Sequence, residues 1–281
     1  MQLQIDENRI PPLPVVATRI MQFDPAGANA SSSSMERIIS PDQSISAEVL
    51  RVANSAYYGR SGTVKTVKDA ITLLGLKAVK NLVILITTRT MASKIKGDLL
   101  RKHCIEFPIV TALVCIDMAK LAGQPELNEE AFLCGLLHRI GMTIIALEKK
   151  SEYADLILRG INEMKSMAEL EQSTYGTTSQ NVCELVVKKW NLPESIAGAI
   201  LSQGITPDQV AGASHQVRIT SLSIHATRQL LQIPALPEDD ARTNAILAHY
   251  NMKADVLSHY TQDYFGMLKE NPFYQNGVAQ G

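Results

Sequence analysis

Apolar residues recur every three or four positions along almost the whole chain, and no stretch of strand length alternates regularly between apolar and polar residues. A repeat near 3.6 residues is typical of an amphipathic helix, whereas a repeat of two is typical of a strand. The pattern therefore predicts an all-α fold, with helices bounded by prolines, glycines and short polar side chains. The expected helices span about 14–23, 35–40, 45–52, 70–74, 76–94, 98–121, 128–137, 151–166, 167–175, 178–190, 194–202, 208–231, 238–250 and 253–269, before a frayed tail.

Two helix starts are predicted from capping side chains. Thr66 followed three positions later by Asp69 is typical of a helix N-terminus, because the two side chains can satisfy backbone N–H groups of the first turn. Ser44 or Ser46 is expected to cap the helix over 45–52.

Two interruptions are also predicted. Pro108 lies inside the apolar pattern of 98–121, and proline lacks the N–H group that a helix interior needs. We therefore expect a kink there. The small residues of 26–34 predict a mobile loop.

Composition and charge exclude several classes of protein. The chain has 281 residues, of which 46% are hydrophobic, enough for a sizeable core in one large domain or two modest ones. Lys and Arg number 27 against 28 Asp and Glu, and no block of like charge could follow a nucleic acid or an anionic membrane. The longest aliphatic run, 82–86, is too short to span a membrane. We therefore expect a cytoplasmic protein with neither nucleic acid nor membrane as a partner.

The cysteines are expected to be reduced and buried. None forms a C-x-x-C pair, and each lies in an apolar helical context, where a free thiol behaves as a small hydrophobe. They are Cys104, Cys115, Cys134 and Cys183.

The stretch G-L-L-H-R-I-G at 135–141 is the most informative in the chain. It resembles the buried helix of the HD superfamily of metal-dependent phosphohydrolases, in which His followed directly by Asp supplies two metal ligands. Here the second residue is Arg139, whose guanidinium has no lone pair to offer a metal. At an effective dielectric of about 20, two unit charges about 4 Å apart interact by about 4 kcal/mol, so Arg139 would repel a divalent ion strongly. The sequence therefore predicts an HD-type scaffold without its metal chemistry.

A wider set of motifs resembles the HDOD family, the HD-related output domains of bacteria. The resemblance covers about residues 9–205, and we expect 206–281 to form a helical extension packed on that part. It implies an HD-superfamily-like bundle of helices and a regulatory or signalling role without demonstrated hydrolase activity. The motifs, in family order, are Leu13-Pro14, Ala53-Asn54-Ser55-Ala56-Tyr57-Tyr58-Gly59, Val67-Lys68-Asp69-Ala70-Ile71 with Leu74-Gly75, His103, and Gly135-Leu136-Leu137-His138 with Ile140-Gly141.

The resemblance can be carried onto the metal-ligand positions one residue at a time. His103 and His138 match the two histidines, whereas Arg139 replaces the Asp and Thr227 falls at about the position of the final Asp. Ser179 and Ser202-Gln203 occupy places where further histidines could stand. At most two inherited ligands survive, so we expect no metal, no cofactor and no catalytic residue.

The remaining candidate site is a vestigial cavity lined by His103, His138, Arg139 and Thr227. Two interpretations are open. The histidines could be ordinary core residues, with Arg139 in a structural ion pair to a carboxylate such as Glu130 or Glu171. Alternatively the cavity could accept an anion such as phosphate or a nucleotide, because Arg suits bidentate contact with phosphate.

A second candidate site is the segment containing Asn54, Ser55, Tyr57 and Tyr58. Its simplest interpretation is a helix terminus with its own side-chain caps. The alternative is a surface that binds a protein partner.

Three functions are therefore compatible with the sequence. The favoured one is a non-catalytic bacterial regulatory module that acts through an unidentified signalling protein or a ligand. The alternatives are a divergent metal-dependent phosphohydrolase and a sensor that binds a phosphorylated small ligand in the vestigial cavity. A phosphohydrolase would need about four to six converging His, Asp or Glu ligands, and the chain offers two inherited ones.

Overall fold

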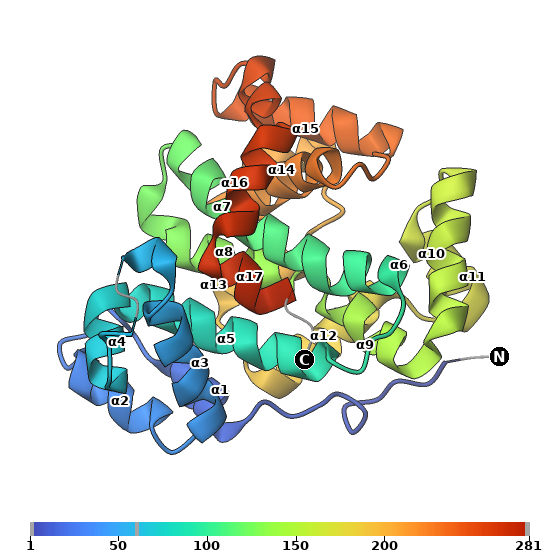
Figure 1. Cartoon of the computed structure of the whole chain (residues 1–281). Coiled ribbons are helices and arrows are strands. Elements are labelled where there is room, and N and C mark those ends of the chain that lie inside the picture. Colours follow the sequence, from blue (N-terminus) through green and yellow to red (C-terminus); the bar gives the residue numbers. More distant parts are fainter. Residues whose placement is uncertain (1–2, 60–61, 279–281) are drawn as a thin grey trace. The chain divides into compact units, whose positions relative to one another are not determined.

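The computed structural model describes residues 3–59 and 62–278 and is 73% helical, with no strand in the described part. The predicted all-α fold is confirmed, and it is a multi-helix bundle. The chain forms two compact units (Figure 1). Unit 1 comprises Met1–Pro11 and Lys94–Leu268, and unit 2 comprises Pro12–Ser93 and Lys269–Gly281.

Unit 2 is built from short helices that pack on the longer helix α5. In this unit α1 and α3 pack against α5, while α2 and α3 pack against α4. The elements are α1 Val15–Gln22, α2 Ser32–Ile39, α3 Gln43–Ala53, η1 Ala56–Tyr58, α4 Val67–Leu74, α5 Leu76–Ala92 and α17 Pro272–Val278.

The N-terminal boundaries in unit 2 correct two sequence predictions. Helix α2 begins at Ser32 rather than 35, because the side chain of Ser31 accepts a hydrogen bond from the N–H of Ser34 and caps the helix. Helix α3 is capped by Asp42, which accepts from the N–H of Ile45, and not by Ser44 or Ser46. The loop predicted over 26–34 is therefore shorter.

The cap predicted for α4 is confirmed. Thr66 Oγ1 accepts from the N–H of Asp69 at 3.1 Å and donates to the Asp69 carboxylate at 2.7 Å. Gly75 ends α4 with φ of 86°, a backbone conformation that side chains rarely adopt, and the chain turns by 113° into α5.

The expected frayed tail is wrong for 272–278, which form helix α17. The Asn276 side chain donates to Glu48 at 2.6 Å, and Arg89 donates to the Asn276 carbonyl at 2.9 Å. Helix α17 thus packs on α3 and α5 through contacts distant in sequence, which local patterns do not report.

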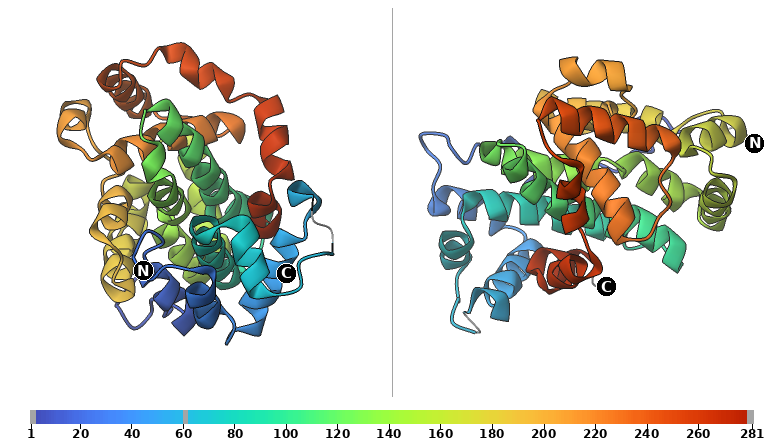
Figure 2. Two further views of the ribbon diagram at one scale, coloured as in Figure 1. Left: turned by 90° about the vertical axis from the view of Figure 1, so that its left-hand side faces the viewer. Right: turned by 90° about the horizontal axis from the view of Figure 1, so that it is seen from above.

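Unit 1 has helix α7 at its centre. Helix α7 packs against α8 and α14, and α7 and α8 (green) run side by side in all views (Figures 1 and 2). The elements are α6 Asp98–Arg101, η2 Lys102–Glu106, α7 Phe107–Leu121, η3 Pro125–Leu127, α8 Asn128–Leu137, α9 Ile140–Lys149, α10 Ser151–Glu163, α11 Met167–Tyr175, α12 Ser179–Trp190, α13 Glu194–Leu201, η4 Pro207–Gly212, α14 His215–Leu230, α15 Pro237–His249, η5 Ala254–His259 and α16 Gln262–Glu270, whose last two residues belong to unit 2.

Two glycines set how closely the central helices approach. A Cβ at Gly135 on α8 would lie 2.7 Å from the Cα of Ala112 on α7. A Cβ at Gly141 on α9 would lie 2.0 Å from the carbonyl oxygen of Ser179 on α12. Both distances are far below van der Waals contact, so only glycine permits these approaches. The two glycines bracket the turn between α8 and α9.

Two long helices predicted in the C-terminal third are shorter in the structure. The stretch 208–231 is divided, because Ala213 is extended and Ser214 caps the new helix α14 by accepting from the N–H of Val217. The stretch 253–269 is divided into η5 and α16. The predicted boundary between 9–205 and 206–281 stays a prediction, although α14 packs on α7, α8 and α13 within unit 1.

By length and composition, the stretch Pro125–Lys149 could cross a membrane, but 89% of its most apolar window is buried in the structure. Helices α4 and α5 pass the same test only as a pair bent by 113°. These are weak indications, since core helices of globular proteins pass the test too. The cytoplasmic location stays a prediction.

Candidate functional site

At Pro108, where the sequence predicts a kink, the structure has a π-helical segment, Lys102–Glu106, just before α7, and Pro108 lies in the first turn of α7. In such a segment each carbonyl accepts from the N–H five residues later, as Lys102 does from Phe107. The corresponding donor for His103 would be Pro108, which has no N–H group. The carbonyl of His103 is therefore left for a side chain.

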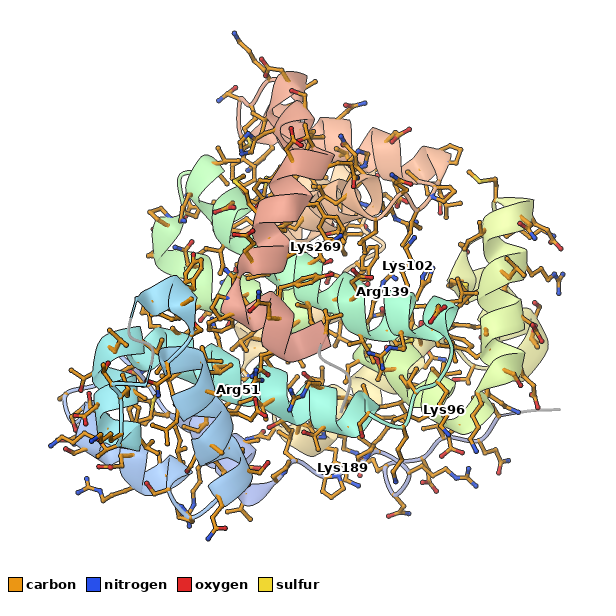
Figure 3. All side chains as sticks on the ribbon, in the orientation of Figure 1. Arg51, Lys96, Lys102, Arg139, Lys189 and Lys269 are labelled. Carbon is orange, nitrogen blue, oxygen red and sulfur yellow. The ribbon has the colours of Figure 1, made fainter. Side chains whose placement is uncertain are left out.

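Arg139 supplies that side chain from the turn between α8 and α9. Its Nη1 donates to the His103 carbonyl at 3.4 Å and to His103 Nδ1 at 3.2 Å. Its guanidinium carbon lies 3.4 Å from the ring centroid of Phe107, a cation–π contact that fixes the plane of the group. Arg139 is only 9% exposed and lies inside unit 1 (Figure 3).

The ion pair expected for Arg139 is wrong. Among the described residues no carboxylate lies within ion-pair distance of it. Glu171 instead accepts from the Tyr153 hydroxyl and the Ser179 N–H, and Glu130 accepts from Gln216 at 2.8 Å. Arg139 is thus a buried cation without an ion-pair partner among the described residues, and Asp239 and Glu171 act on its charge only at longer range.

Burial, and then the charge of nearby Arg228, lower the pKa of Arg139 to about 9. Arg139 is therefore still a cation at neutral pH. Its Nε and Nη2 donate to no acceptor in the part of the chain that the structure describes. One edge of the guanidinium is available for a ligand.

His103 and His138 are both neutral. Burial, and then the charge of Arg139, lower the pKa of each to about 3. His138 Nδ1 donates to the Gly135 carbonyl at 2.6 Å, so its Nε2 carries the lone pair. His103 Nδ1 accepts from Arg139, so its Nε2 carries the proton. Within 3–59 and 62–278 both Nε2 atoms are buried without a partner.

Two cavities meet at Arg139. The larger, of about 1000 Å³, is lined by residues that include His138, Arg139, Ser179, Gln203, Arg228 and Arg242. The smaller, of about 60 Å³, is lined by His103, Arg139, Lys165, Arg228 and apolar side chains, with no carboxylate. The structure therefore brings His103, His138 and Arg139 together, as the sequence predicts.

Thr227 is not part of either cavity wall. It is completely buried and accepts a hydrogen bond from Thr111 at 3.1 Å between α14 and α7. The cavity residue is its neighbour Arg228. The uncertain position of the last family motif accounts for this error of one residue.

Sequence reasoning also missed how Arg228 and Arg242 are held. Both pair with the single carboxylate of Asp239, and Arg228 Nη1 also donates to the Pro234 carbonyl at 2.8 Å. The Nε of Arg228 is buried without a partner among the described residues. Arg228 and Asp239 lie on different helices, α14 and α15, so no local sequence pattern predicts that they pair.

The residues at this site do not fit a divalent metal. The lone pair of His103 Nδ1 is taken by Arg139, and only His138 Nε2 offers a free one. No group of three or more His, Cys, Asp or Glu that could hold a metal occurs within the described ranges. The site does not fit a metal because too few side chains can donate a lone pair, and because Arg139, a cation, stands where a ligand would be needed.

The second candidate segment contains a well-bonded helix end. Asn54 ends α3, and its side chain donates to the carbonyls of Leu50 and Val64 and accepts from the N–H of Val64. Tyr57 is 61% exposed and packs edge-on against Tyr58. Ser55 Oγ is buried without a partner in the described structure. Asn54 has a structural role, and a partner surface at Tyr57 and Tyr58 stays a prediction.

An all-helical bundle that keeps two buried histidines beside a former ligand position defines a protein of the HD type. The family model described as the HDOD domain matches residues 10–204, and the chain belongs to that family.

One curated relative is similar in sequence. An uncharacterized protein of Treponema pallidum (strain Nichols) is 22% identical over 200 residues, which are 69% of this chain and 38% of the relative. The chain therefore spans less than half the length of that relative.

Solved structures share the fold. A Shewanella amazonensis SB2B protein, named provisionally as a phosphohydrolase, has a TM-score of 0.71 at 23% identity, covering 97% of this chain and 96% of its own. An HDOD domain protein of unknown function from Geobacter sulfurreducens has a TM-score of 0.69 at 18% identity, covering 94% and 92%. A Marinobacter aquaeolei VT8 protein, named provisionally as a signal transduction protein, has a TM-score of 0.69 at 21% identity, covering 99% and 62%. At these identities the likeness shows the fold alone.

Proposed function

We propose that this chain is a non-catalytic regulatory module that works by binding a ligand or a protein partner. The observation that carries the proposal is the hydrogen bond from Arg139 to His103 Nδ1. Arg139 stands where the HD pattern has an Asp ligand. Its Nη1–H group donates to His103 Nδ1 and so occupies the lone pair of a second ligand position. A signalling role also agrees with the name given to the structurally similar Marinobacter protein.

The alternative phosphohydrolase would need a divalent ion at this site. Arg139 is buried, still charged at neutral pH and fixed against the Phe107 ring, so it cannot swing away without losing both the cation–π contact and its bonds to His103. A doubly charged ion beside it would meet an unscreened repulsion of several kcal/mol. The donor set thus favours the regulatory function.

We expect the purified protein to hold no stoichiometric iron, manganese or zinc and to leave generic phosphate mono- and diesters intact. The reason is that the site offers one free imidazole lone pair next to a fixed cation. Elemental analysis and release of p-nitrophenol from chromogenic phosphoesters measure the two outcomes.

The matched control is the same assay after adding each metal in excess, followed by a chelator. Hydrolysis that appears with one metal and disappears with the chelator would contradict the regulatory function and restore the phosphohydrolase.

A further inference from the structure

The smaller cavity offers hydrogen-bond donors and no acidic acceptor. Arg139, Arg228 and His103 line it. The Nε and Nη2 of Arg139 make no hydrogen bond within the described residues, and Arg228 Nε and His103 Nε2–H are buried there without a partner. His103 is 5% exposed, so no bulk water reaches this group freely. Buried donors normally have partners, and the two here, Arg228 Nε and His103 Nε2–H, belong to residues that line one small cavity with Arg139, so they call for a shared acceptor.

The charge of this cavity selects an anion. The cationic residues on its wall are Arg139, Arg228 and Lys165, and no Asp or Glu lines it. Among the described residues Arg228 pairs with Asp239, which it shares with Arg242, and Lys165 pairs with exposed Glu163. Arg139 forms no ion pair with a carboxylate among the described residues, although the charges of Asp239 and Glu171 interact with it at longer range. An anion between the two arginines would relieve their mutual repulsion and accept charge-assisted hydrogen bonds from both.

The volume narrows the choice of anion. A buried water needs roughly 10–15 Å³ of this kind of space, so about 60 Å³ corresponds to about four to six oxygen-sized atoms, enough for a small oxyanion but not for a nucleotide. A tetrahedral oxyanion such as a phosphoryl group has four oxygens. The planar edge of Arg139, fixed by the Phe107 ring, is suited to two of them.

The larger cavity supplies a hydrogen-bond acceptor in addition to donors. It shares Arg139 and Arg228 with the smaller one and adds His138, whose Nε2 is a buried acceptor without a partner. A neutral imidazole nitrogen with a lone pair accepts from a hydroxyl or amine. A cavity of about 1000 Å³ can hold a small organic molecule.

We propose that the smaller cavity binds the phosphoryl group of a phosphorylated small molecule through Arg139, Arg228 and His103, with the organic part of that molecule in the larger cavity. This assignment rests on the regulatory function proposed above and names the class of ligand it would recognise. A hydroxyl of the organic part would donate to His138 Nε2.

Titration calorimetry with inorganic phosphate, AMP and adenosine, all in EDTA at neutral pH, tests the assignment. We expect phosphate to bind, AMP to bind at least about tenfold more tightly because it adds contacts in the larger cavity, and adenosine not to bind measurably. If AMP binds no more tightly than phosphate, the part that places an organic group in the larger cavity is overturned.

Two variants locate the site. Arg139→Met should weaken phosphate binding by about a hundredfold, since it removes two charge-assisted hydrogen bonds. It leaves no carboxylate without a partner, but it removes the donor to the His103 carbonyl and Nδ1, so its folding is checked by circular dichroism. Arg139→Lys keeps the charge but not the planar edge, and should weaken binding by about tenfold, so it serves if the methionine variant does not fold. Arg9→Met is the matched control, because Arg9 is exposed and pairs with Glu148 on the surface of the same unit.

The remaining outcomes separate this proposal from the regulatory function. Equal phosphate binding by wild type and Arg139→Met would overturn the assignment. The assignment would also be overturned if the wild type bound neither phosphate nor AMP at concentrations up to about 10 mM, because a specific site should bind below that concentration. In both cases the proposed regulatory function would still stand. Binding that occurs without EDTA and is lost in EDTA would place the phosphate on a metal and overturn both.

Discussion

Replacing Gly141 by alanine is expected to destabilise the protein by about 3 kcal/mol, at the upper end of what overpacking costs. The added Cβ would lie 2.0 Å from the carbonyl oxygen and 2.9 Å from the carbonyl carbon of Ser179. Both are backbone atoms, so no side-chain rotation can relieve the clash, and α9 must move away from α12. Urea unfolding followed by circular dichroism measures the change.

The matched control for this substitution is Gly266→Ala in α16. A Cβ there meets nothing within 4 Å, so the alanine should be neutral or should stabilise by up to about 1 kcal/mol through its better helix propensity. A Gly141→Ala variant as stable as the Gly266→Ala variant would show that α9 and α12 do not approach so closely.

The same substitution connects the packing to the site. Arg139 stands at the N-terminus of α9, two residues before Gly141, and its Nη1 reaches the π-helical segment before α7. Displacing α9 from α12 would therefore move the guanidinium relative to His103. In Gly141→Ala we expect weaker phosphate binding as well as lower stability, whereas Gly266→Ala should change neither adversely.

The sequence predicted which residues lie at the site better than it predicted the hydrogen bonds and ion pairs among them. His138 and Arg139 are consecutive in G-L-L-H-R-I-G, and the resemblance to the HDOD family matched His103 to the other histidine of the same site, which was enough to place the three together. The partner of Arg139 was not predictable. Glu171, a reasonable choice by position, is already held by Tyr153 and the Ser179 N–H.

The errors in the fold have a common physical cause. The periodicity of apolar residues shows which face of a helix is buried. It does not show where a backbone N–H or carbonyl group bonds to a side chain, or to a different turn, in place of its usual helical partner. Ser214 accepts from the Val217 N–H and divides a predicted helix, and the missing N–H of Pro108 is accommodated by a π-helical segment instead of a simple kink. Helix α17 depends on Glu48 and Arg89, residues far away in the sequence.

The free energy of unfolding is expected to fall steeply as the pH decreases from about 6.5 toward 4. In the folded protein the pKa values of His103 and His138 are lowered to about 3, whereas an unfolded histidine has a pKa near 6.5. In this window the unfolded chain binds more protons than the folded one, so acid favours unfolding. The stability is fully present above pH 6.5 and is lost as the pH falls toward 3.

Each of these two histidines contributes a slope of up to about 1.4 kcal/mol per pH unit, so together they cost about 4 kcal/mol at pH 5. Glu171 acts in the opposite sense, because burial raises its pKa. The test is therefore a comparison of slopes between wild type and the double variant His103→Gln/His138→Asn, in which Asn can still donate to the Gly135 carbonyl. The free energy of unfolding of the variant is expected to differ from that of wild type at neutral pH, but it should decrease far less when the pH is lowered. Parallel slopes for the two proteins would mean that the imidazoles take up protons in the folded state, and the neutral forms assigned to them at the Arg139 cavities would be wrong.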